Sequence, residues 1–400
     1  MAKPEQEFQI AVSTRIIFGV GKSRELGALL AQRGYRSVAI CTDANLIQAG
    51  VLPGIESYLR AAKIGYFVYD RVKENPDLQT VLVAKKRAAG ERLDCILGVG
   101  GGGPIDVAKA LSVALSQEGE LRDYVAYTTG QKKPISGRLL PVVAVPTTAG
   151  SGAEVSPVAV IVDERIQTKV GFFSEGLFPE LAVVDPALTV TLPPGPTAGA
   201  GMDVFAHAFD AFVSRKATVY TDALAKEAME IVFRWLRTAV WQGEDLQARS
   251  AMSAASIMAL LAIYLGRGGA VHTIGEPLGA IYDLPHGYSC AVAIPAMMKQ
   301  LLPVCRGQLA EIYGLSGSRQ AHDQGGGDPA GACIEELKRL IRETGLPAPR
   351  TVLPNPDIAR LSGASAEHLA VDRVPMPLGK AEYLKLYGEI FSAGYLGEAK

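Results

Sequence analysis

The chain has 400 residues, of which 48% are hydrophobic and 20% are charged, and its formal net charge is -1. This composition excludes a basic nucleic-acid tract and a disordered acidic tail, so we expect a small neutral or anionic partner and no nucleic acid. A chain of this length exceeds what one hydrophobic core usually organises, and two domains are expected.

Two segments of the sequence argue against export and against a membrane span. Residues 1–7 are polar and lack the apolar stretch of a secretory signal. The most apolar uncharged stretch, residues 250–266, is shorter than the ~20 residues that a bilayer needs, so we predict a buried helix there and no membrane partner. The five cysteines are scattered singly without a C-x-x-C pair, which fits a reducing compartment, and we expect a cytoplasmic location.

Short β-branched runs alternate with longer helical patterns from residue 36 to about residue 184. Because such alternation is typical of βαβ units, it predicts a parallel sheet covered by helices on both faces. The expected strands are residues 37–41, 66–69, 95–99, 142–145 and 181–184.

A glycine-rich turn follows the third expected strand, at residues 98–109, and leads into a helical pattern. In that context bare backbone can approach a pyrophosphate, and Gly98, Gly100 and Gly103 fit G-x-G-x-x-G. Five glycines in six residues satisfy many patterns, however, and a simple tight turn explains this match equally well. A second small-residue loop, residues 146–156, leaves the fourth strand with hydroxyl and amide donors. Two such loops on one parallel sheet favour a nucleotide site.

The carboxylate expected to bind a ribose is Asp43, at the end of the first expected strand. A standard dinucleotide fingerprint would place this acid about 20 residues after the glycines, whereas Asp43 precedes them. The order of the two features therefore differs from that of the usual Rossmann pattern.

The residue composition of the chain changes after the proline-rich residues 193–196. Long segments rich in Ala, Leu, Met and Glu follow, such as residues 221–238 and 247–264, and they predict helices. We expect an α/β nucleotide-binding domain at residues 1–188, built on a parallel sheet, and an all-α metal-binding and catalytic domain at residues 189–400.

Metal-ligand residue types recur in the predicted helical half. Asp203 and His207 are spaced i and i+4, so they lie on one face of a helix, and His272 and His286 supply two more imidazoles. Any one of these histidines alone is explained as well by an ordinary hydrogen bond. One carboxylate and three imidazoles together suit Fe²⁺ or Zn²⁺. His322 and His368 have no such companions in the sequence and are predicted to lie at the surface.

In combination these segments resemble the iron-containing (group III) alcohol dehydrogenases, whose two-domain fold is also similar to that of dehydroquinate synthase. The likeness covers most of the first 300 residues and is highly specific. It implies a divalent metal held by Asp203, His207, His272 and His286. It also implies NAD rather than NADP, because Asp43 would disfavour a 2′-phosphate. The cofactor-binding residues implied by the resemblance are Asp43, Asn75, Gly100, Gly101, Gly102, Asp106, Thr147, Thr148, Ser151 and Lys169.

The sequence departs from the family pattern at several positions. Gly103 replaces a serine of the first loop, and Glu276 stands where the family commonly has a histidine close to the substrate. Glu276 is therefore a candidate proton acceptor. Arg267 precedes His272 in a stretch where members of the family more often have small residues. It is either a cation at a helix C-terminus or a contact to Glu276 or to an anionic substrate group.

These features predict hydride transfer between a small alcohol or aldehyde and the nicotinamide of NAD, with the metal ion, His272 among its ligands, acting on the substrate oxygen. The alternative is an NAD-using sugar-phosphate cyclase or lyase of the dehydroquinate synthase type. Such an enzyme needs a cluster of basic residues for phosphate, which the motifs lack beyond Arg267. By resemblance, we also expect a homo-oligomer such as a dimer.

Overall fold

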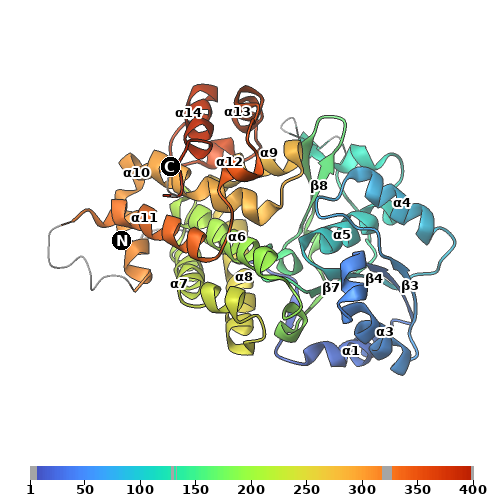
Figure 1. Ribbon diagram of the computed structural model, residues 1–400. Coiled ribbons are helices and arrows are strands. Elements are labelled where there is room, and N and C mark those ends of the chain that lie inside the picture. Colours follow the sequence, from blue (N-terminus) through green and yellow to red (C-terminus); the bar gives the residue numbers. More distant parts are fainter. Residues whose placement is uncertain (1–6, 128–129, 132, 318–326, 398–400) are drawn as a thin grey trace. The chain divides into compact units, whose positions relative to one another are not determined.

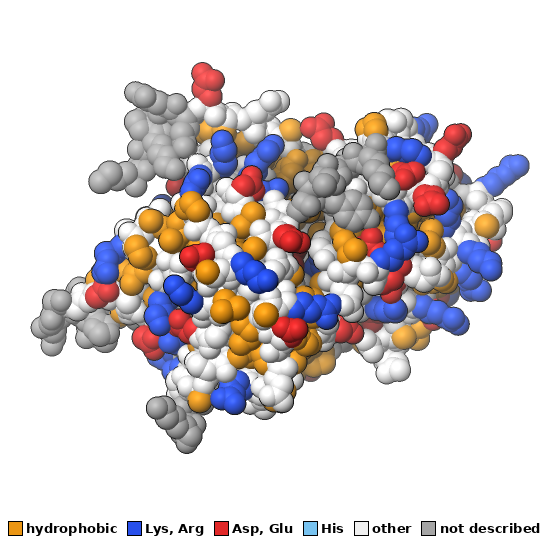
Figure 2. Space-filling model, turned by 90° about the horizontal axis from the view of Figure 1, so that it is seen from above, with side chains coloured by type: hydrophobic (Ala, Val, Ile, Leu, Met, Phe, Trp, Pro, Cys, Tyr) orange, Lys and Arg blue, Asp and Glu red, His pale blue; other side chains and the backbone are white. Residues whose placement is uncertain are grey.

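The computed structural model describes residues 7–127, 130–131, 133–317 and 327–397. The chain divides into two compact units: Ala11–Leu192, and a second unit that begins at Pro193 and also contains residues 7–10. The sequence had placed the domain boundary near residue 188. Positively and negatively charged side chains are interspersed on the surface shown in Figure 2, in keeping with the net charge of -1.

The first unit is built on a six-stranded sheet in which each neighbouring pair of strands is parallel. The five predicted strands are all present, and a sixth, β1, was not predicted. In spatial order the strands are β1 (Arg15–Phe18), β10 (Leu181–Val184), β7 (Val142–Pro146), β4 (Cys95–Gly100), β2 (Ser37–Cys41) and β3 (Gly65–Tyr69).

Helices cover both faces of this sheet, as predicted (Figure 1). Successive side chains of a strand point to opposite faces, so Val38 and Ile40 of β2 join one core while Ala39 and Cys41 join the other. The first core is closed by α1 (Leu26–Gln32) and α3 (Val51–Ala61), and the second by α4 (Leu78–Ala88) and α5 (Gly102–Ser116). Between β2 and α3 lies the short α2 (Ala44–Gln48).

A second sheet of four antiparallel strands was not predicted. Its order is β6 (Gly130–Gln131), β5 (Ala126–Tyr127), β9 (Thr168–Phe173) and β8 (Val158–Asp163). Alternate residues of the β8–β9 hairpin, such as Ile161 and Phe172, are buried in the core formed by α4 and α5. The 3-10 helices of this unit are Lys22–Glu25, Leu121–Tyr124, Ala153–Val155, Glu175–Leu177 and Pro186–Thr189.

The second unit is helical throughout its described regular structure, as predicted. Helix α6 (Pro194–Val213) packs against α7 (Val219–Trp241), α8 (Leu246–Gly266) and α10 (His286–Leu315). The remaining helices are α9 (His272–Tyr282), α11 (Pro329–Glu343), α12 (Pro349–Val352), α13 (Ile358–Ala366) and α14 (Lys380–Ile390), with a 3-10 turn at Val371–Arg373.

Helices α8 and α10 are long and apolar enough to cross a membrane by length and composition alone. Both pack against other helices of the same unit, and 44% of the apolar window of α8 and 72% of that of α10 are buried inside it. Core helices pass the same test of length and hydropathy, so this feature by itself does not indicate a membrane span.

Candidate active site

The two glycine- and hydroxyl-rich loops lie at the point in the parallel sheet where the order of the strands along the chain reverses. From β2 the chain continues to β3 on one side, whereas from β4 it continues to β7 on the other. Ligands of such sheets bind outside the carboxyl ends of the strands at this switch point. Asp43 follows β2 and the Gly100–Gly102 turn follows β4, so the two features flank the switch point. Helix α5 begins at Gly102 and directs its N-terminal N–H groups to the same edge.

The two loops are fitted against each other by small residues. The N–H of Thr147 donates to the carbonyl of Gly100 over 2.9 Å. A Cβ at Gly102 would lie 2.9 Å from the Ser151 Oγ, and one at Gly101 would lie 3.3 Å from the Thr148 Oγ1. The glycines are therefore needed for the close approach of the second loop, and the predicted residues of both loops lie together.

A buried lysine holds the second loop in place. Lys109 is fully buried in α5, and its Nζ donates to the carbonyls of Ala153, Ser156 and Val158 over 2.6 to 2.8 Å. Burial lowers the pKa of Lys109 to about 8 and raises that of the neighbouring Glu154 to about 7. This structural role of Lys109 could not be predicted from the sequence, because the lysine lies about 44 residues or more before the loop carbonyls that it binds.

Asp106 belongs to the same cluster rather than to an open loop. Its Oδ2 accepts the N–H of Val160 in β8 over 3.2 Å, and its Oδ1 lies 3.9 Å from the Nζ of Lys109. Burial raises the pKa of Asp106 to about 6. These contacts give Asp106 a structural role beside the predicted cofactor role.

Three further residues of the predicted cofactor set have separate positions. Asp43 is the N-cap of α2 and accepts the N–H of Asn45 over 3.0 Å. Asn75 lies in the segment that packs on the first loop, where a Cβ at Gly103 would be 3.2 Å from the carbonyl of Lys73. Lys169 is half-buried in β9, opposite Val162 of β8.

The four predicted metal ligands come together in the helical unit. Asp203 and His207 lie one turn apart on α6, while His272 and His286 are the first residues of α9 and α10. The Oδ1 of Asp203 is 3.5 Å from the Nε2 of His286, 3.8 Å from the Nε2 of His272 and 4.0 Å from the Nδ1 of His207. Ligands of a common tetrahedral ion lie about 3.4 Å apart, so this spacing is only slightly wider.

Close packing of the helices produces this convergence. A Cβ at Gly287, next to His286, would lie 2.2 Å from the carbonyl oxygen of Gly199, so α6 and α10 approach to backbone contact. That contact lies one turn of α6 before Asp203. Any side chain at Gly287 would separate the two helices that carry the site.

Two buried imidazole nitrogens at this site lack a hydrogen bond in the part of the chain that the structure describes. Among the described residues, the Nδ1 of His207 and the Nε2 of His272 are buried without a hydrogen bond. Burial lowers the pKa of His207, which favours the neutral imidazole that binds metals. The rings of His207 and His272 are stacked with centroids 4.7 Å apart. Buried imidazole nitrogens that make no hydrogen bond with the protein are suited to bind a cation through their lone pairs.

A carboxylate that sequence reasoning missed orients one of these imidazoles. Asp210 is 1% exposed, and its Oδ2 lies 2.8 Å from the Nδ1 of His272 while its Oδ1 accepts the N–H of Val271 over 2.7 Å. A hydrogen bond at Nδ1 leaves the Nε2 lone pair of His272 directed to Asp203. The signal was present in the sequence, because Asp203, His207 and Asp210 are spaced i, i+4 and i+7 on one helix face.

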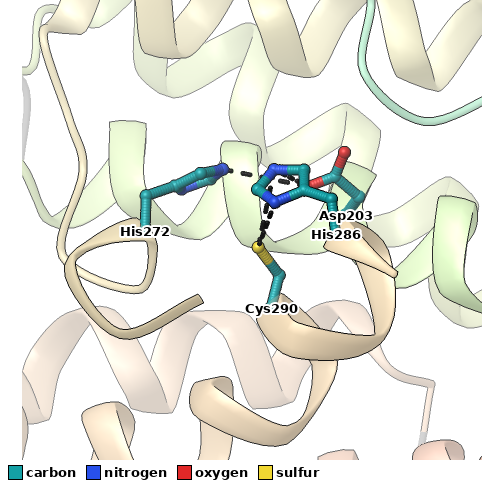
Figure 3. A group of neighbouring side chains, drawn as sticks. All are labelled: Asp203, His272, His286 and Cys290. Carbon is teal, nitrogen blue, oxygen red and sulfur yellow. Dashed lines mark hydrogen bonds and ion pairs between the residues drawn. The ribbon is translucent and has the colours of Figure 1, made fainter. Parts of the chain in front are cut away.

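Cys290 is a second residue that the sequence did not reveal. Its Sγ lies 3.8 Å from the Nε2 of His286, one turn earlier on α10. The donor atoms of Asp203, His272, His286 and Cys290 all lie within 4.8 Å of one another. Figure 3 shows the carboxylate and the two imidazoles pointing toward one another, with the thiol beside His286. In the sequence, Cys290 had contributed only to the argument for a reducing compartment.

Glu276 contacts His368 rather than Arg267, the partner considered from the sequence. The prediction that His368 lies at the surface is wrong. The Oε2 of Glu276 lies 2.7 Å from the Nε2 of His368, whose side chain is only 11% exposed. His368 is not a surface residue because the segment after α13 packs on α9. Arg267 is the exposed C-cap of α8 and makes no ion pair with Glu276. His322 lies outside the described residues.

A parallel nucleotide-type sheet followed by a helical unit with a buried Asp–His cluster is the two-domain arrangement that the resemblance to the iron-containing alcohol dehydrogenases implied. The comparisons with known proteins agree. A family model described as iron-containing alcohol dehydrogenase matches residues 13–186, and one for the C-terminal part of the Fe-containing alcohol dehydrogenase family matches residues 197–354. The chain belongs to the iron-containing alcohol dehydrogenase family, and the resemblance stated above is confirmed.

Relatives match over nearly the whole chain. Long-chain-alcohol dehydrogenase 1 of Geobacillus thermodenitrificans is 32% identical over 387 residues, which cover 94% of this chain and 97% of that protein. The 1,3-propanediol dehydrogenase of Klebsiella pneumoniae is 32% identical over 342 residues, or 85% and 87% of the two chains.

Solved structures agree with this assignment. A 1,3-propanediol oxidoreductase superposes with a TM-score of 0.90 at 29% identity, covering 96% of this chain and all of that one. The NADH-dependent butanol dehydrogenase A of Thermotoga maritima superposes with a TM-score of 0.85 at 26% identity, over 95% and 98% of the two chains. This protein is accordingly an oxidoreductase that acts on alcohols, and the cyclase alternative is not supported.

Proposed function

We propose that this enzyme transfers hydride between a small alcohol and NAD, and in reverse reduces the aldehyde, with Fe²⁺ or Zn²⁺ bound in the helical unit. The observation that carries the proposal is the convergence of Asp203, His207, His272 and His286 from three helices, with two of the buried imidazole nitrogens making no hydrogen bond within the described part of the chain. A relative and a solved structure named for NAD or NADH use support the choice of cofactor.

The first unit would bind the dinucleotide at the switch point of its sheet. Gly100, Gly101 and Gly102 would lie against the pyrophosphate, with the N-terminus of α5 facing its charge. Asp43 would accept hydrogen bonds from the adenosine ribose, and its charge would disfavour a 2′-phosphate. The hydroxyls of Thr147, Thr148 and Ser151, together with Asn75, Asp106 and Lys169, complete the proposed cofactor set.

In the helical unit the Asp203 carboxylate and the imidazoles of His207, His272 and His286 would hold the cation. A bound divalent cation supplies Lewis acidity, which eases deprotonation of an alcohol and polarises an aldehyde. Asp210 keeps His272 in the required tautomer. Glu276 lies one turn beyond His272 on α9 and would accept the hydroxyl proton of the alcohol.

The identity of the substrate is proposed only as a class, small alcohols and aldehydes. An anionic substrate group would find a positive charge at Arg267, whose guanidinium is exposed and makes no ion pair with a described residue. Replacing Arg267 by Ala would then raise the KM for such a substrate and leave kcat unchanged.

We also propose a cytoplasmic homo-oligomer, such as a dimer. All five cysteines are buried and none is in a disulfide, as is usual in a reducing compartment. Strand β1 lies at the edge of the parallel sheet with Ile16 and Phe18 exposed, and apolar edge strands are common association surfaces. Light scattering of the purified protein measures the oligomeric state directly.

The test combines metal content with NAD⁺ reduction on a panel of short alcohols, diols and hydroxy acids, for the wild type and for His272→Ala. We expect about one metal ion per chain in the wild type and loss of both metal and NADH formation in the variant. Circular dichroism establishes that the variant is folded.

The panel also names the substrate class. A wild-type protein that reduces NAD⁺ with none of these compounds would contradict the proposed reaction. Retention of the metal by folded His272→Ala would contradict the ligand assignment instead.

A further inference from the structure

Glu276 is held by an imidazole that comes from a distant part of the chain. The Nε2 of His368 and the Oε2 of Glu276 are 2.7 Å apart although the residues are separated by 92 positions. Their side chains are 11% and 20% exposed, so solvent screens this contact less than it would a surface pair. Glu276 follows His272 by four residues on α9, which places both on one helix face.

The second nitrogen of His368 fixes its protonation state. The N–H of Ala370 donates to the Nδ1 of His368 over 3.1 Å, so Nδ1 carries a lone pair and the ring proton resides on Nε2. Protonation of Nδ1 would break this bond and place two N–H groups against each other. The pair therefore consists of a neutral imidazole that donates its Nε2–H to a carboxylate.

The segment that carries His368 packs on α9 and on the loop that leads into it. A Cβ at Gly269 would lie 2.6 Å from the Cβ of Ala370, so residue 370 packs on the loop that leads into His272. The Tyr387 hydroxyl bonds to Ser365 at the end of α13 and donates to the carbonyl of Ile274 in α9. These contacts set the position of the His368 ring relative to α9.

We propose that His368 is a positioning residue for Glu276 in the alcohol dehydrogenase reaction, and this inference rests on the proposed function. The Nε2–H of His368 holds the carboxylate on the face of α9 that carries His272. In alcohol oxidation the hydroxyl proton passes to a remaining lone pair of Glu276, directly or through one water, while the hydride passes from the alcohol carbon to NAD⁺. The products are the aldehyde, NADH and protonated Glu276, which returns its proton to solvent.

The first test is kinetic and compares His368→Ala, His368→Gln, Glu276→Gln and the double variant His368→Ala/Glu276→Gln. We expect His368→Ala to lower the single-turnover rate of NADH formation about 10- to 100-fold, part of what a general base contributes, with little change in the KM for the alcohol. The amide N–H of His368→Gln should recover part of the rate. In the Glu276→Gln background, loss of His368 should have no further effect.

A matched control removes a different link between α9 and the α13 segment. The Tyr282 hydroxyl accepts the N–H of Asp357 over 2.6 Å, and Tyr282→Phe removes this bond without touching Glu276. Its rate should stay within about twofold of the wild type. Equal rate losses for His368→Ala in both backgrounds, or an unchanged rate in folded His368→Ala, would overturn the proposal.

The second test does not depend on activity. In protein labelled with ¹⁵N-histidine, the His368 signal, assigned by its loss in His368→Gln, should show the Nε2–H tautomer and a downfield proton. Glu276→Gln should move that proton upfield because the carboxylate acceptor is lost. A His368 signal that is insensitive to Glu276→Gln would contradict the hydrogen bond. Correct signals in a protein that oxidises no alcohol would instead place the failure in the proposed function.

Discussion

Replacing Asp210 by Asn tests whether the carboxylate behind His272 controls metal binding. In the wild type the Oδ1 accepts from the N–H of Val271 and the Oδ2 pairs with the Nδ1 of His272, over 2.7 and 2.8 Å. An asparagine keeps one oxygen and gains an NH₂ group that must face one of these two donors. If it faces His272, the ring must accept at Nδ1 and carries its proton on Nε2, which blocks the lone pair directed to Asp203.

The alternative orientation of the amide is also unfavourable. An NH₂ group facing Val271 would leave a buried backbone N–H opposite another donor, at a cost of about 1–3 kcal/mol. Loss of a carboxylate behind a metal-binding histidine typically lowers metal affinity 10- to 100-fold, equivalent to about 1.4–2.7 kcal/mol. We therefore expect Asp210→Asn to weaken Zn²⁺ binding by this factor, measured by competition with a chromophoric chelator.

Asp185→Asn is the matched control. Asp185 is also buried and accepts hydrogen bonds from Gly21 and Ser23, but it belongs to the first unit. Its substitution should lower the free energy of unfolding and leave Zn²⁺ affinity unchanged. A folded Asp210→Asn protein with Zn²⁺ affinity within about threefold of the wild type would refute the reasoning.

Three further outcomes are expected. Burial raises the pKa of Glu154 to about 7 from an ordinary value of 4.5, so folding takes up a proton between these pH values and the free energy of unfolding falls as the pH rises through them. Glu154→Gln should flatten this fall in denaturant titrations at pH 4.5 to 8, and an unchanged slope would contradict the shift. Asp43→Ser keeps an N-cap for α2 but removes the charge, so the ratio of kcat/KM for NADP⁺ to that for NAD⁺ should rise roughly tenfold; a constant ratio would show that Asp43 only caps the helix. Because sulfur is a soft donor, Cys290→Ser should weaken Zn²⁺ binding more than Fe²⁺ binding, whereas Cys333→Ser, at another buried cysteine of the helical unit, should change neither.

The parallel sheet could be predicted because its central strands are buried on both faces and are therefore continuously apolar, as in residues 142–145. Strand β1 lies at the edge and is partly exposed, so it lacked that signal. The second sheet was missed for another reason. Two of its strands are only two residues long, and the β8–β9 turn places Gln167, rather than a glycine, in the left-handed region at φ 50°.

The cluster of proposed metal ligands could be predicted because residue type and spacing indicate it. Asp203 and His207 share a helix face, and histidines are few in this chain. Asp210 could have been found from the same periodicity. Cys290 could have been found in the same way, because it follows His286 by four residues on α10. His368 could not, because its role depends on a tertiary contact, the return of the chain after α13 to Glu276. No local pattern encodes such contacts.

The charges of the helical unit also bear on the site. Asp203 and Asp210 are 3% and 1% exposed, and three imidazoles lie within 4.0 Å of one or the other carboxylate. When the three imidazoles are in the neutral form that binds metals, the two carboxylates give a charge of -2, which a divalent cation would balance, and such balance matters most where burial makes isolated charge costly. Glu276 stands one turn outside this balanced set with a neutral partner in His368. Its negative charge is thus the one that uptake of a proton from the alcohol would neutralise, without disturbing the residues that would hold the cation.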